Sequence, residues 1–126
     1  MGFQPKKIFT VAEARKTLPL VKKIVSDILN QSYESHIMAN IMGQDAHNHP
    51  QILEKMDTVQ ELITELEDIG CYYKDWSFQI GLVDFPAEID GRLVFLCWRS
   101  DEKDIIYYHD LQAGFVGRKT IPNEYR

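Results

Sequence analysis

Apolar residues recur at helical spacing through the first third of the chain, and this pattern predicts helices there. Thr10 and Glu13 have the spacing of a capping box, so we expect a helix to begin near Val11. Pro19 cannot donate a backbone hydrogen bond, and we place it in the first turn of a new helix capped by Thr17. The apolar stripe of this new helix extends toward Met42 and consists of Leu20, Val21, Ile24, Val25, Ile28, Leu29, Tyr33, Ile37 and Ile41.

A second apolar stripe follows the polar stretch GQDAHNHP, residues 43–50, which we interpret as a loop. This stripe predicts a helix from Pro50 through Asp68, ended by Gly70 as a left-handed cap. The two helices should form an antiparallel hairpin. If the first helix is unbroken from Thr17 to Met42, it is about 39 Å long, against about 28 Å for the second. The excess length would then be free to contact a second copy of the chain.

The apolar period changes from helical spacing to two in the last third of the chain, which predicts antiparallel strands. The pair Asp90-Gly91 suits a type I′ turn, so residues 81–89 and 92–100 should form a hairpin. Counting back from this turn places Phe85 opposite Leu96, Asp84 opposite Cys97 and Val83 opposite Trp98. The stretch DIIYYH predicts a third strand after the polar turn SDEK.

These elements predict a single α+β domain over residues 1–126. A long antiparallel helical hairpin, at about residues 10–70, packs on a three-stranded antiparallel β-meander with a C-terminal tail, at about residues 76–126. Because side chains alternate across a sheet, one meander face is apolar and should pack on the helices. The other face is only partly apolar, and we expect something to cover it; it carries Leu82, Asp84, Pro86, Glu88, Leu93, Phe95, Cys97 and Arg99.

His109 is a further candidate for the face of Asp84. A last turn of three or five residues would place His109 on that face, whereas two or four residues would turn it toward the helices. The sequence leaves both alternatives open. Glu102 and Arg118 lie close in sequence to the ends of the predicted strands and can reach the same region.

Composition narrows the class of protein. With 14 basic and 19 acidic residues, the net charge is −5, which argues against nucleic acid as a partner. The longest apolar run, LVFLCW, is far shorter than the roughly 20 residues of a membrane-spanning helix. Two cysteines are too few for a disulfide framework, and the start MGFQPKK has no signal-peptide pattern. We therefore expect a soluble, cytoplasmic protein that does not bind a membrane.

Asp84 admits a structural and a functional interpretation. In the first, Asp84 forms an ion pair with Arg99 and has no further role. In the second, Asp84, Cys97, Arg99 and His109 form a pocket, with Glu102 and Arg118 nearby. Zinc accepts carboxylate, thiolate and imidazole, but Arg99 would disfavour a cation, so we place a small-molecule anion ahead of a metal.

The sequence gives weaker support to two other kinds of site, a cysteine nucleophile and a metal site in the loop. A nucleophilic Cys97 needs a lowered pKa, which a neighbouring carboxylate opposes. The loop residues Asp45, His47 and His49 contain a His-x-His pair that can chelate a transition metal, but loop histidines without further ligands are usually solvated.

Three ordered motifs, FTVAEARKTLPL, GLVDFPA followed by GRLVFLCWR, and YYHDLQAGFVGR, resemble the bacterial family catalogued as domain of unknown function 2203. The resemblance runs from Phe9 to Arg118. It implies a fold and a residue set, with no established activity or cofactor. The corresponding residues are Glu13, Leu18, Pro19, Asp84, Phe85, Cys97, Trp98, Arg99, Glu102, His109, Gly114, Phe115 and Arg118.

These observations favour the first of two functions, and the second is the alternative. The first is a binding module that forms a homodimer through the long helix or through the second sheet face, where Phe95 would lie. The second is a small enzyme or ligand-binding protein with an anion or metal pocket around Asp84, Cys97, Arg99 and His109. The cofactor is unknown, and whether the protein is an enzyme is left open.

Overall fold

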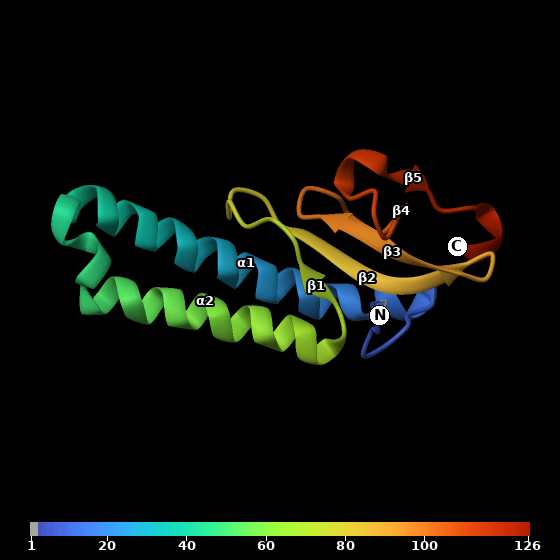
Figure 1. Ribbon diagram of the computed structural model, residues 1–126, viewed down its shortest axis with the longest axis horizontal. Helices are drawn as coiled ribbons and strands as arrows, with labels where there is room; N and C mark the ends of the chain where they lie inside the picture. Colours follow the sequence, from blue (N-terminus) through green and yellow to red (C-terminus); the bar gives the residue numbers. More distant parts are fainter. Residues whose placement is uncertain (1–2) are drawn as a thin grey trace.

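The fold is α+β, with two long helices on one side of an antiparallel sheet (Figure 1). A computed structural model describes residues 3–126, without the side chain of His47. The helices are α1 (Val11–Met42) and α2 (Pro50–Ile69), joined by the 3-10 helix η1 (Gly43–Asn48). The strands are β1 (Tyr72–Tyr73), β2 (Leu82–Ile89), β3 (Arg92–Arg99), β4 (Tyr107–Asp110) and β5 (Lys119–Thr120). Two short 3-10 helices, η2 (Phe115–Gly117) and η3 (Asn123–Tyr125), lie near the C-terminus.

Helix α1 is continuous, so the predicted restart at Pro19 is wrong. The capping box at Thr10 and Glu13 is present, but Thr17 lies inside the helix and its hydroxyl donates to the carbonyl of Glu13. Pro19 is exposed, whereas Leu18 and Val21 on either side of it are buried. The packing of one unbroken apolar face against the sheet therefore outweighs the local cost of the proline.

The hairpin end of α1 and α2 projects beyond the sheet (Figure 1). At about 1.5 Å per residue, α1 is about 48 Å long and α2 about 30 Å. Gly70 ends α2 in the predicted left-handed conformation, with φ of 113°. The predicted loop after α1 is mostly the 3-10 helix η1. Among the described residues, neither helix has a stretch apolar enough to span a membrane.

The sheet has five antiparallel strands in the order β1-β2-β3-β4-β5, so the three-stranded meander was incomplete. The central β2–β3 hairpin has the predicted register, including Asp84 opposite Cys97. Its turn is formed by Asp90 and Gly91, both with positive φ. The strands that the prediction lacked, β1 and β5, contain only two residues each and pair with the outer edges of β2 and β4.

One face of the sheet forms the main core with the helices. Gly81 marks how closely the layers approach, because a Cβ added there would lie 2.3 Å from Cγ1 of Val25. As the alternation predicted, one face of β2 and β3 is apolar and packs in the core, and its buried residues are Val83, Phe85, Ala87, Ile89, Val94, Leu96 and Trp98. The opposite face carries the candidate site.

Candidate functional site

Asp84 and His109 form a buried pair across the sheet. His109 lies opposite Phe95 in the β3–β4 register, so its side chain is on the face of Asp84, one of the two alternatives that the sequence left open. Nε2 of His109 lies 3.1 Å from each carboxylate oxygen of Asp84. His109 is only 2% exposed and Asp84 only 4%. The imidazole therefore spans the intervening strand β3 to reach the carboxylate on β2.

The second ring nitrogen of His109 has a different partner. Nδ1 lies 2.8 Å from the backbone carbonyl oxygen of Asp110. A carbonyl can only accept, so Nδ1 carries a hydrogen and donates it. Nε2 then faces two carboxylate oxygens, an arrangement that is favourable when a proton or a metal cation lies between the nitrogen and the carboxylate.

Cys97 completes a group of three on neighbouring strands. It is fully buried on β3, directly opposite Asp84. One ligand atom from each of Asp84, Cys97 and His109 lies within 4.8 Å of the other two. This is the one such group of three or more metal-ligating side chains in the part of the chain that the structure describes.

Burial and the charge of Asp84 together shift the pKa values of its two ionisable neighbours, Cys97 and His109. Burial raises the pKa of the Cys97 thiol to about 12, and the Asp84 carboxylate adds to this effect. Burial by itself lowers the pKa of His109, but the hydrogen bonds to Asp84 and to the Asp110 carbonyl raise it overall above 6.5. A free Cys97 thiol is thus a poor nucleophile at neutral pH, whereas His109 is readily charged.

A cavity of about 270 Å³ adjoins the group. Apolar side chains supply much of its wall, and Lys74 is the one lysine or arginine that lines it. Its lining consists of Lys74, Leu82, Asp84, Phe95, Cys97, His109, Leu111, Gly114 and Phe115. The predicted cover of this face is present in the chain itself: Phe3 packs on Phe95, with ring centroids 5.3 Å apart, and the segment after β4 closes the other side.

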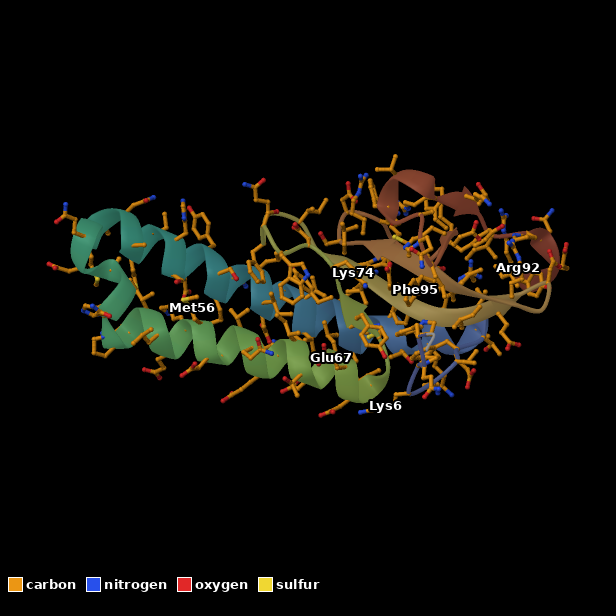
Figure 2. The ribbon with its side chains drawn as sticks, viewed as in Figure 1. Lys6, Met56, Glu67, Lys74, Arg92 and Phe95 are labelled. Carbon is orange, nitrogen blue, oxygen red and sulfur yellow. The ribbon has the colours of Figure 1, made fainter. Side chains whose placement is uncertain are left out.

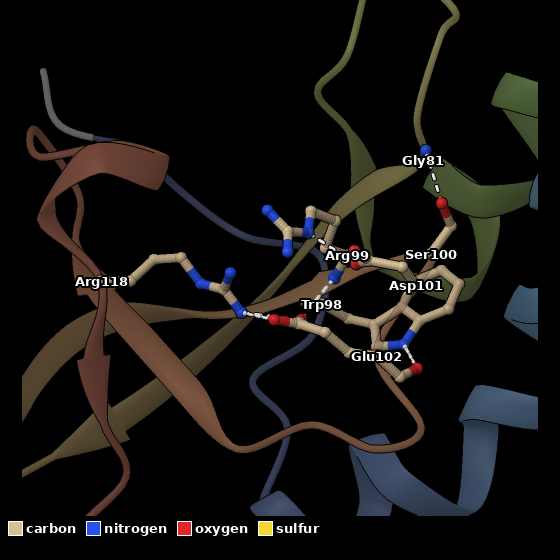
Figure 3. Close-up of polar contacts among 7 residues, drawn as sticks. All are labelled: Gly81, Trp98, Arg99, Ser100, Asp101, Glu102 and Arg118. Carbon is tan, nitrogen blue, oxygen red and sulfur yellow. Dashed lines mark hydrogen bonds and ion pairs between the residues drawn. The ribbon is translucent and has the colours of Figure 1, made fainter.

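Arg99 is not part of this cavity, which corrects both interpretations that used it. Its Nε donates to a carboxylate oxygen of Asp101 at 2.6 Å (Figure 3). The predicted ion pair between Asp84 and Arg99 is therefore wrong. Asp101 lies two residues away in the following turn and is the nearer acceptor, while the carboxylate of Asp84 is taken by His109. The reason for placing an anion ahead of a metal is also removed.

Glu102 and Arg118 form a separate ion pair (Figure 3). A terminal nitrogen of Arg118 lies 2.7 Å from one carboxylate oxygen of Glu102, and that oxygen also accepts from the backbone amide of Arg99. The Arg118 guanidinium lies over the rings of Tyr107 and Phe115. The pair ties the β3–β4 link to the C-terminal segment, beside the cavity and outside its lining.

The loop histidines do not gain a metal site among the described residues. His49 caps α2, with Nδ1 accepting from the amide of Gln51. Asp45 is exposed and belongs to no metal-ligating group that the structure describes. The prediction for His47 falls on a side chain outside the described residues.

The sequence-based prediction of the site lacks three contributors. Lys74, Leu111 and the carbonyl of Asp110 belong to no recognisable motif, because a lysine near an aromatic pair or a carbonyl after a histidine is common in any sequence. Their roles follow from tertiary position. The one sequence signal for Lys74 is its place in YYK before the sheet, and this pattern gives no link to Asp84.

The comparisons with known proteins support the sequence resemblance. No curated protein and no solved structure matches the chain. The model of one family, described as "Uncharacterized conserved protein (DUF2203)", matches residues 7–121. This span contains all three members of the buried group and nearly every element of the fold. The chain therefore belongs to the uncharacterised DUF2203 family.

Proposed function

We propose that this protein binds a divalent transition-metal ion, preferably zinc, through Asp84, Cys97 and His109. The observation that carries the proposal is the convergence of one oxygen, one sulfur and one nitrogen ligand within 4.8 Å in a buried position. Carboxylate, thiolate and imidazole are all zinc ligands. Three protein ligands are also typical of zinc sites in which an exogenous group takes the fourth position.

The environment of His109 supports a ligand role. Metal-binding histidines usually donate their second ring hydrogen to a carbonyl or a carboxylate, which orients the ring. Here Nδ1 faces the Asp110 carbonyl and Nε2 faces the carboxylate of Asp84, while the Cys97 sulfur belongs to the same group of ligand atoms. A cation between these atoms would satisfy Nε2 without a second proton on the imidazole.

The thiol gives a reason to prefer a metal over a simple ion pair. An imidazolium and a carboxylate satisfy each other, but this pair does not require a thiol beside it. A bound cation would stabilise the thiolate and displace the proton of Cys97. The metal affinity should therefore rise with pH, because binding releases protons from Cys97 and His109.

Cobalt titration tests the proposal directly. Protein stripped with chelator should bind one Co²⁺ per chain and develop a near-ultraviolet thiolate-to-metal absorption. Cys97→Ala should abolish this absorption. Cys71→Ala is the matched control, since Cys71 is also buried but its thiol donates to the Leu66 carbonyl in the main core. An unchanged band in Cys97→Ala, or no Co²⁺ binding by the folded parent protein, would contradict the proposal.

A separate observation favours self-association of the helical hairpin. Large apolar side chains of the two helices are exposed, with Tyr33 67%, Ile41 79% and Met56 58% exposed. Met56 lies on the part of the hairpin that extends beyond the sheet (Figure 2). The sheet face that carries Phe95 is less suitable as a dimer interface, because Phe95 is buried and Phe3 of the same chain packs on it. We therefore propose that two copies pair through the hairpin ends, which would cover these side chains.

Sedimentation velocity tests this second proposal. The parent protein should sediment as a dimer, and Ile41→Glu should shift it to a monomer. Leu20→Glu is the matched control, because Leu20 is 54% exposed on the same helix but lies away from the hairpin end. A parent protein that remains monomeric at high concentration, or equal effects of the two substitutions, would refute pairing through the hairpin.

A further inference from the structure

Lys74 places a positive charge beside the cavity of the Asp84–Cys97–His109 group. It follows β1, and its backbone amide donates to the carbonyl of Leu82, which also lines the cavity. Its Nζ lies 5.3 Å from the ring centroid of Phe95 and 6.0 Å from that of Tyr72. Figure 2 labels Lys74 and Phe95. No carboxylate of the described residues lies within ion-pair distance of this ammonium group. Lys74 is thus held at the cavity by aromatic rings and keeps its charge available.

The other charges near the cavity are paired. Glu102 neutralises Arg118, and Asp101 neutralises Arg99. A divalent cation held by one thiolate and one carboxylate is itself neutral overall. The remaining charge is that of Lys74, so an occupant with one negative charge would leave the site neutral.

The cavity wall indicates the rest of the occupant. Leu82, Phe95, Leu111 and Phe115 line it with apolar surface. A volume of about 270 Å³ corresponds to roughly nine water molecules at about 30 Å³ each, which is enough for one ring and a small polar group. The polar group of an occupant would be placed beside Lys74 and the three metal-ligating side chains, and its ring against the apolar side chains of the lining.

We propose that this cavity takes a small aromatic or branched-chain carboxylate, whose carboxylate binds the metal and pairs with Lys74. The inference rests on the proposed metal site and adds the class of its ligand. It also replaces Arg99 by Lys74 as the residue that holds an anion. Lys74 is a specificity residue in this proposal, because a neutral ligand of the same shape gains nothing from it.

Benzoate and benzamide provide a matched pair of probes for the cobalt-loaded protein. They have nearly the same shape, but only benzoate is charged. Benzoate should change the visible cobalt spectrum in a saturable way, and benzamide should bind at least several-fold more weakly. Lys74→Met should weaken benzoate binding by about fivefold, as expected for loss of a partly exposed ion pair, and leave benzamide and Co²⁺ binding unchanged. Lys119→Met is the control, since Lys119 is an exposed lysine outside the cavity lining.

The outcomes separate this inference from the metal proposal. A protein that shows the thiolate-to-cobalt band but no spectral response to benzoate has the metal site without the ligand site. If Lys74→Met weakened the binding of benzoate and of benzamide equally, Lys74 would act through shape alone, and the charge argument would be overturned. Failure to form the cobalt band would overturn both proposals.

Discussion

The buried pair of Asp84 and His109 predicts a pH-dependent effect of Asp84→Asn on the metal-free protein. Both side chains are almost fully buried, and each carboxylate oxygen lies 3.1 Å from Nε2. Removing one partner of a buried ion pair costs about 3–5 kcal/mol, because the other charge is left uncompensated. Asparagine keeps the volume of aspartate, so we take the lower end, about 3 kcal/mol of unfolding free energy at about pH 5.5.

The sign of the pH dependence follows from the raised pKa of His109. Asp84 and the Asp110 carbonyl hold this pKa above 6.5 against the effect of burial. The stability from the pair is therefore fully present below about pH 6.5 and is lost as the pH rises through the native pKa. In Asp84→Asn, the neutral imidazole can accept a hydrogen bond from the new amide. The unfolding free energy lost in Asp84→Asn should accordingly fall to about 1 kcal/mol at about pH 8.5.

Guanidinium unfolding in chelator, followed by tryptophan fluorescence at both pH values, measures this difference. The m-value should stay constant, so that a change in midpoint reports a change in stability. Asp101→Asn is the control, because its pair with Arg99 is exposed and should contribute less than about 1 kcal/mol at either pH. An equal loss for Asp84→Asn at the two pH values, or a larger loss at the higher one, would refute the charged pair.

Three further substitutions test other parts of the fold by the same unfolding assay. Glu102→Gln should cost about 2 kcal/mol, because Arg118 keeps its charge in a mostly buried position, and an effect below about 0.5 kcal/mol would contradict this role. Pro19→Ala should stabilise the protein by about 1–3 kcal/mol by restoring a helical hydrogen bond in α1, whereas destabilisation would show that the proline is accommodated without cost. Gly81→Ala should cost about 1–3 kcal/mol through its clash with Val25, and a neutral effect would mean that the two layers separate readily.

Local chemistry made the centre of the sheet predictable from the sequence. A two-residue turn at Asp90 and Gly91 sets the register of β2 and β3, and that register alone brings Asp84 next to Cys97. The capping box and the cap at Gly70 likewise set helix ends through backbone groups close in sequence. These predictions succeeded because each depended on neighbouring residues.

The remaining features depend on tertiary context. The link between β3 and β4 is seven residues long, from 100 to 106, so no short-turn rule decided the side of His109. Strands of two residues have no periodicity to detect, which is why β1 and β5 were missed. The predicted ion-pair partner of Arg99 was wrong because the actual acceptor, Asp101, lies in the turn, where no strand register applies.

The three potential ligands come from three successive strands, and this has a consequence for how the sheet assembles. Because side chains alternate, moving either outer strand by one residue relative to β3 would turn its ligand to the opposite face. Only correctly paired strands would thus bind an ion at Asp84, Cys97 and His109. Slipped arrangements would lack the binding free energy of that ion and would be less stable than the native register. Metal binding would then act as a check on strand alignment.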